Sequence, residues 1–105
     1  MARFMRVIVF FDLPTITNTD KREYRKFRQL LIKSGFLMIQ ESVYSKLVLN
    51  TTAANVVLGQ LRKGKPRKGL VQAMIITEKQ YARIEFIVGD QVTDVLNDNS
   101  ETVII

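Results

Sequence analysis

The pattern of apolar and polar positions predicts an alternation of strands and helices along the chain. From Arg6 to Phe11 nearly every residue is β-branched or aromatic, and Asp12, Leu13 and Pro14 follow. A run this apolar predicts a central strand that is buried on both faces. Because proline cannot donate to a strand ladder, Pro14 ends the strand and leaves Asp12 at its carboxyl end, facing a loop.

The segment 20–35 has the clearest helical pattern in the sequence. Asp20 and Glu23 have the spacing of a capping box, and Gly35 is the residue type that ends many helices in a left-handed conformation. An apolar stripe recurs at intervals of three and four residues and consists of Tyr24, Phe27, Leu30, Leu31 and Ser34. The opposite half of the helix carries Lys21, Arg22, Arg25, Lys26, Arg28 and Lys33. This arrangement predicts an amphipathic helix with a basic outer face.

The rest of the chain predicts a hairpin, a second helix and two more strands. Two strand-like segments, of which the second alternates, are separated by Glu41 and Ser42, and this short connection predicts an antiparallel hairpin. The second helix has cap candidates at Asn50, Thr51 and Thr52 and is weakened by Gly59. Its apolar positions are Ala53, Val56, Val57 and Leu61. The expected elements are strands over 36–40 and 43–49, a helix over 50–63, a strand over 70–77, a turn over 78–82 and a short strand over 84–89.

This order of elements predicts an α+β fold of the ferredoxin-like kind (βαββαβ), with an antiparallel sheet and an additional C-terminal strand. We expect residues 1–90 to form this domain and residues 91–105 to form a tail whose apolar end offers an edge strand. Both helices of such a fold cover one face of the sheet. The other face would expose apolar side chains to water, so we expect a homodimer that packs sheet to sheet.

Charge and composition narrow the class of function. Residues 1–68 hold 14 lysines and arginines against 4 acidic residues, whereas residues 69–105 hold 2 against 6. This segregation indicates a surface that faces a polyanion. The chain has no cysteine and no histidine, which excludes a thiolate zinc site and the usual general base. The absence of cysteine fits a cytoplasmic location, and we expect neither a signal peptide nor a membrane span.

Two groups of basic residues are candidates for contacts with phosphates. The first lies on the predicted helix face and consists of Arg22, Arg25, Lys26 and Lys33. The second lies around a loop rich in glycine and lysine and consists of Arg62, Lys63, Lys65, Arg67 and Lys68. Such contacts position a nucleic acid without reading its bases. No aromatic residues are interleaved for stacking on single strands, so the pattern favours duplex or mixed substrates over sequence-specific single-stranded RNA. We expect the partner to be duplex DNA, with RNA as the alternative. The alternative is a solvated basic surface that aids solubility.

Three segments together resemble a known family. They read FFDLP at the end of the first strand, KREYRKFRQLLIKSGF over the first helix and QESVYSKL in the hairpin. Over about residues 4–90, the chain resembles CRISPR-associated protein two, in the form that accompanies single-effector systems. The resemblance implies a ferredoxin-like homodimer that helps to insert foreign DNA as new spacers and bridges two dimers of a larger integrase subunit. It also implies a metal-dependent endonuclease activity on RNA or duplex DNA, and the family's metal-binding aspartate corresponds to Asp12.

Asp12 is the only acidic residue among the first 19, and one carboxylate is poor for a two-metal nuclease. Two Asp12 side chains facing each other across a dimer axis would suit one Mg²⁺, which is content with one or two carboxylates, waters and phosphate oxygens. The structural alternative is that Asp12 caps a nearby turn. Three functions therefore stay open: a DNA-binding adaptation subunit with little or no catalysis, a magnesium-dependent endonuclease that uses Asp12 pairs, and a toxin-like ribonuclease of the same fold.

Overall fold

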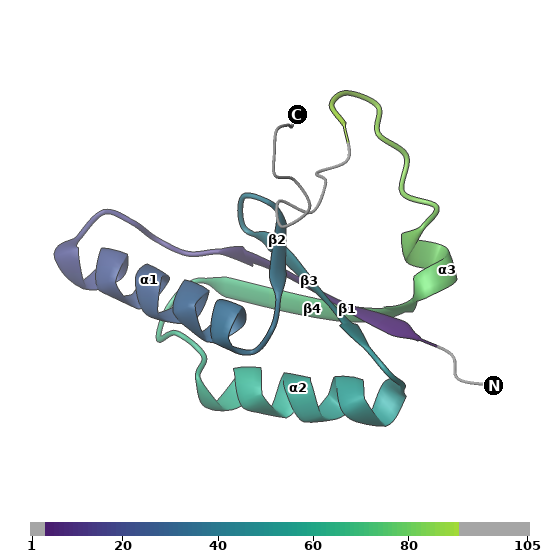
Figure 1. The fold of residues 1–105 in the computed structure, drawn as a ribbon. Helices are drawn as coiled ribbons and strands as arrows, with labels where there is room; N and C mark the ends of the chain where they lie inside the picture. The colour runs from purple at the N-terminus through teal and green to yellow at the C-terminus, as the bar shows by residue number, and fades with distance from the viewer. Residues whose placement is uncertain (1–3, 91–105) are drawn as a thin grey trace, which may run out of the picture.

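A four-stranded antiparallel sheet carries two helices on one face (Figure 1). The computed structural model describes residues 4–90 of the chain. The sheet has the strand order β2-β3-β1-β4. Its elements are β1 (Met5–Asp12), α1 (Asn18–Lys33), β2 (Leu37–Gln40), β3 (Val43–Val48), α2 (Thr51–Lys63), β4 (Leu70–Thr77) and the single turn α3 (Glu78–Tyr81). This topology confirms the predicted ferredoxin-like α+β fold.

The two faces of β1 meet different surroundings. Val7, Val9 and Phe11 are buried beneath the helices, where they join the core residues of α1 and α2. On the other face Ile8 is buried, but Phe10 keeps 36% of its surface exposed. The prediction of a strand buried on both faces was therefore only half right. A sheet with both helices on one side leaves its other face without a covering layer.

The helix α1 begins earlier than the sequence pattern suggested. Thr17 is the N-cap: its hydroxyl accepts a hydrogen bond from the backbone N–H of Asp20 at 3.0 Å, and the Asp20 carboxylate accepts one from the backbone N–H of Thr17 at 3.1 Å. The expected box with Asp20 as the cap and Glu23 as its partner was wrong. The capping box lies three residues earlier, with Thr17 as the cap and Asp20 as its partner at the third helical position.

The end of α1 confirms the role predicted for Gly35. Gly35 has a φ of 92°, and its N–H bonds the carbonyl of Ile32 while the N–H of Phe36 bonds the carbonyl of Leu31, each at 3.0 Å. These two bonds form a Schellman motif. The motif turns the chain sharply, so that β2 begins at Leu37.

The second helix, α2, is capped as predicted by Asn50, whose side chain accepts a backbone N–H from the first turn at 2.8 Å. Its buried residues are Ala54, Val57 and Leu61. Val56, expected on the apolar face, is exposed, and Ala54 takes that place. Ala54 and Val56 are two residues apart and therefore lie on different sides of the helix. Which of the two is buried depends on which side of α2 packs against the sheet.

The predicted fifth strand over 84–89 is absent from the single chain, and this expectation was wrong. After β4 the chain makes the single turn α3, and residues 82–90 pair with no strand among residues 4–90. Ile84, Phe86, Ile87 and Val88 are exposed. A strand needs a ladder partner for its backbone groups, and α3 carries the segment away from the edge of the sheet (Figure 1). The tail predicted over 91–105 lies outside the described residues.

Two glycines are expected to respond in opposite directions to substitution by alanine. A Cβ at Gly59 would have no neighbour within 4 Å, whereas Gly35 has a φ of 92° and a Cβ there would lie 2.5 Å from the Lys46 Nζ. We expect Gly59→Ala to raise the free energy of unfolding by about 0.5–1 kcal/mol because helical glycine is entropically costly. We expect Gly35→Ala to lower it by about 1–2 kcal/mol. Urea unfolding monitored by circular dichroism measures both, and a loss of stability in Gly59→Ala would contradict the open environment seen there.

Candidate nucleic-acid interface

The loop between α2 and β4 runs along α1. At its beginning the backbone of Gly64 packs against Leu30, because a Cβ at Gly64 would lie 2.5 Å from the Leu30 side chain. At its end the Lys68 Nζ lies 3.6 Å from a carboxylate oxygen of Asp20, in the first turn of α1. Between loop and helix lies a cavity of about 360 Å³, lined by Leu13, Pro14, Thr19, Asp20, Glu23, Pro66, Arg67 and Lys68. Helix and loop therefore form one continuous surface.

Every basic residue that the sequence proposed for phosphate contact is exposed. The residues are Arg22, Arg25, Lys26, Lys33, Arg62, Lys63, Lys65, Arg67 and Lys68. Those of the second group come from the last turn of α2 and from the loop that packs along α1. The structure thus brings together two clusters that are about 30 to 40 positions apart in the sequence. We call these residues the helix–loop surface.

Asp20 is buried and links the start of α1 to the loop, because its carboxylate contacts both Thr17 and Lys68. Its carboxylate accepts the backbone N–H of Thr17, and this hydrogen bond, assisted by the nearby Lys68, holds the pKa of Asp20 below its ordinary value although desolvation opposes the shift. The Lys68 side chain remains 72% exposed, so its pairing with Asp20 leaves it open to other anions. Asp20 is therefore a structural acid within a basic surface, a role that sequence reasoning assigned only as a helix cap.

Asp12 lies at the end of β1 next to the same loop. Asp12 pairs with Leu70 of β4, and a Cβ at Gly69 would lie 2.8 Å from the Asp12 carbonyl oxygen. The Asp12 side chain is exposed and alternates with that of Phe11, so it belongs to the face of the sheet opposite the helices. Within residues 4–90 no three potential metal ligands gather. A Mg²⁺ at this position would be held by the Asp12 carboxylate together with waters and phosphate oxygens, or with a second carboxylate from another copy of the chain.

The face of the sheet opposite the helices is largely apolar, and we call it the open face. Side chains that alternate with the core residues of β1, β3 and β4 point to this side. Its exposed apolar members include Phe10, Leu47, Leu70 and Met74. The structure therefore places an apolar surface and a basic surface on opposite sides of the sheet.

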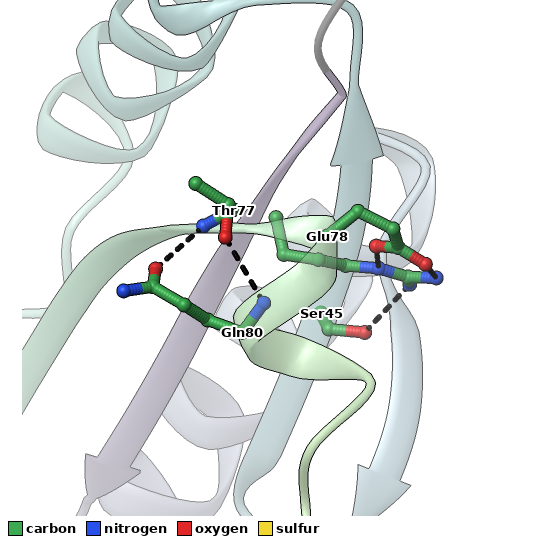
Figure 2. A network of polar contacts seen from close by, with 5 residues as sticks. Ser45, Thr77, Glu78 and Gln80 are labelled. Atoms are coloured by element: carbon green, nitrogen blue, oxygen red, sulfur yellow. Dashed lines mark hydrogen bonds and ion pairs between the residues drawn. The ribbon is translucent and has the colours of Figure 1, made fainter.

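One polar network interrupts the open face and attaches α3 to it (Figure 2). The Arg6 guanidinium donates to both carboxylate oxygens of Glu78, at 2.6 and 3.1 Å, and to the Ser45 hydroxyl at 3.4 Å. The guanidinium also lies 4.2 Å from the centre of the Tyr81 ring. The hydrogen bond with Glu78 raises the pKa of Arg6, although burial opposes the shift. Thr77 and Gln80 close a capping box at the start of the same turn.

Sequence reasoning missed this network, since Arg6 and Glu78 are 72 positions apart. The sequence did contain one signal, which is the single charge of Arg6 at the start of an apolar strand. A charged side chain is tolerated at a buried position only when it is paired. The sequence does not say which of the distant acids is that partner.

A known protein family matches most of this chain. The family described as CRISPR associated protein Cas2 matches residues 5–84. The chain belongs to the Cas2 family. The resemblance inferred from the sequence motifs is thereby confirmed, and with it a place among CRISPR-associated proteins.

Two relatives in this family match over nearly their whole length. A protein of Treponema denticola named CRISPR-associated endoribonuclease Cas2 is 52% identical over 101 residues, covering 96% of this chain and 100% of the relative. A protein of the same name from Streptococcus mutans is 42% identical over 99 residues, covering 94% and 91%. A crystal structure of a Cas2 protein matches with a TM-score of 0.60 at 20% identity, covering 96% of this chain and 99% of that one, which supports the ferredoxin-like fold.

Of the helices described here, none combines the length and apolarity needed to cross a membrane.

The Asp20 carboxylate predicts how stability depends on pH. Its pKa in the folded chain lies below the ordinary value of 3.8, so its contribution is present above that value and is lost as the pH falls through the folded-state pKa. We expect Asp20→Asn to flatten the decline in the free energy of unfolding below about pH 4. Urea unfolding at a series of pH values measures this decline. Glu41→Gln, at an exposed site, is the control, and a decline in Asp20→Asn as steep as in the wild type would contradict the assignment.

Proposed function

We propose that this Cas2-family chain is a CRISPR adaptation subunit that binds duplex DNA through its phosphates. In this proposal two chains form a symmetric homodimer in the cytoplasm, and the dimer bridges integrase subunits while foreign DNA is inserted as new spacers. The association with single-effector systems stays a prediction. The observation that carries the proposal is the separation of the basic helix–loop surface from the apolar open face.

The helix–loop surface suits a duplex backbone. Its cations come from α1, from the last turn of α2 and from the loop along α1, and all of them are exposed. Lysine and arginine side chains that neutralise phosphates release counterions, which provides most of the affinity in binding without sequence preference. Among residues 4–90, the helical aromatics Tyr24 and Phe27 pack against or within the core. They are therefore not available as stacking platforms for single-stranded bases.

The open face suits a second copy of the chain. Phe10, Leu47, Leu70 and Met74 are partly exposed there, and contiguous apolar surface of this kind usually marks an interaction site. Packing two open faces together would leave both helix–loop surfaces on the outside of the dimer. A two-fold dimer would therefore carry one helix–loop surface on each of its two outer sides. This arrangement suits a dimer that holds DNA while it bridges two integrase partners.

Neutralising cations of the helix–loop surface is expected to weaken DNA binding and its dependence on salt. For a duplex of fixed length, the logarithm of the association constant should fall linearly with the logarithm of salt concentration. Each phosphate contact removed should reduce that slope by about 0.9. We expect Arg22→Gln combined with Lys26→Gln to reduce the slope by roughly 1.8, measured by fluorescence anisotropy at several salt concentrations.

The matched control is Lys79→Gln, which removes a positive charge from an exposed lysine of α3. Its salt dependence should stay at the wild-type value because α3 is attached to the open face. A loss of slope in the control about half that of the double variant, and so equal for each charge removed, would mean that net charge alone drives binding. A wild-type affinity indifferent to salt would contradict the proposed function.

A second candidate function is phosphodiester hydrolysis, which the names of the relatives and the position of Asp12 favour. Both relatives described above are named endoribonucleases. Asp12 is exposed on the open face at the end next to the basic loop, so a two-fold dimer would bring a pair of these carboxylates within reach of bound phosphates. A Mg²⁺ held by that pair would polarise a phosphoryl oxygen and activate a water. The loop cations Lys65 and Arg67 would orient the substrate.

Replacing Asp12 by alanine separates the two functions. If the chain acts by holding DNA, Asp12→Ala should support integration with its partner at nearly the wild-type level, measured as spacer insertion in vitro. If it acts as a nuclease, cleavage of RNA or duplex DNA should require Mg²⁺ and disappear in Asp12→Ala. Cleavage equal in wild type and variant would point to a contaminating nuclease. Abolished integration by an Asp12→Ala protein that still dimerises would contradict the leading proposal.

A further inference from the structure

Arg28 is held in place on the flank of α1 that faces β3. Its Nε donates a hydrogen bond to the Tyr44 hydroxyl at 3.0 Å. Among the contacts within residues 4–90, this is the one hydrogen bond or ion pair formed by a cationic side chain of α1. Arg28 is nevertheless exposed. The side chain is therefore both ordered and accessible.

Arg28 does not stand alone on this flank. Lys21 and Arg25 precede it at intervals of seven and three residues, which places the three cations on one stripe of the helix. Lys21 and Arg25 are exposed like Arg28. The stripe extends the helix–loop surface around α1, away from the loop and toward the hairpin β2–β3.

Tyr44 is a rigid anchor for Arg28. Only 2% of its surface is exposed, and its ring stacks on Phe11 with centroids 5.8 Å apart and planes 27° apart. Phe11 in turn meets Phe27 and Tyr24 edge to face, at 5.2 and 5.9 Å. The Tyr44 hydroxyl thus extends from the aromatic core to its rim, where it can move little.

The geometry of the guanidinium leaves its phosphate-binding edge free. Arginine has five N–H donors in a planar fork, and Tyr44 occupies the one on Nε. The two Nη groups remain available for a bidentate contact with a phosphate. A long side chain ordinarily loses rotamer freedom when it binds, and part of that loss is already incurred in Arg28 before DNA arrives.

We propose that Arg28 contacts a phosphate of duplex DNA and that Tyr44 is the positioning residue that orients it. This inference rests on the proposed function, because it adds a contact to the same DNA-binding surface. It distinguishes Arg28 from Arg25, whose side chain has no such anchor among residues 4–90. Tyr44 acts only through Arg28 and does not touch the DNA.

The test is a double-mutant cycle on duplex DNA affinity. Arg28→Ala should reduce the salt slope by about 0.9, the value for one phosphate contact. Tyr44→Phe removes only the hydroxyl, and we expect it to weaken binding roughly two- to tenfold, the worth of one hydrogen bond, with the salt slope unchanged. In the Arg28→Ala background, Tyr44→Phe should have no further effect. In the Arg25→Ala background it should keep its full effect.

Additional measurements separate positioning from a merely structural role. Thermal unfolding by circular dichroism reports whether Tyr44→Phe is folded. Arg28→Lys, which leaves the core untouched, should keep the salt slope, bind more weakly than the wild type and be insensitive to Tyr44→Phe.

An affinity of Tyr44→Phe equal to that of the wild type would overturn the inference, and so would equal losses with and without Arg28. In both cases salt-dependent binding by the wild type would leave the proposed function standing. A wild-type protein that does not bind duplex DNA would overturn both.

Discussion

The alternation of side chains along β1 is the constraint on which the rest of the molecule depends. Val7, Val9 and Phe11 point to the helices and Phe10 and Asp12 to the other side, because successive residues of a strand face opposite ways. Because β1 lies between β3 and β4, its register with each of them determines which side chains of those two strands share each face of the sheet. A shift of one residue would bring Asp12 under the helices and expose Phe11.

Burial on one side of this strand organises the surfaces that matter for function. Phe11 gathers Tyr24, Phe27 and Tyr44 around it, which fixes how α1 lies across the sheet. With its apolar stripe committed to the core, α1 must turn its lysines and arginines outward. The loop from Gly64 to Lys68 then packs along the same helix and adds its own cations. The basic surface is thus a consequence of how the core packs.

The open face shows how a polar group is accommodated on an apolar surface. Arg6 is neutralised by Glu78, bonded to Ser45 and placed over the Tyr81 ring, so most of its donors are satisfied. The same contacts hold α3 against the sheet and set the direction in which residues 82–90 leave α3. Because the Glu78 side chain is 40% exposed, solvent screens this ion pair and it adds little net stability. The main effect of the ion pair is to fix the position of α3 on the open face.

Local signals in the sequence determined the order of elements, the amphipathic helix α1, the end of that helix at Gly35 and the basic residues of the helix–loop surface. These follow from periodicity, turn chemistry and charge, which act over a few residues. Tertiary structure decided which face of β1 stays open, that residues 84–89 form no strand in the single chain, that Glu78 pairs with Arg6 and that Tyr44 anchors Arg28. Each of these depends on residues that are distant in sequence and meet only when the sheet and helices pack, because burial and ladder pairing are properties of the assembled layers.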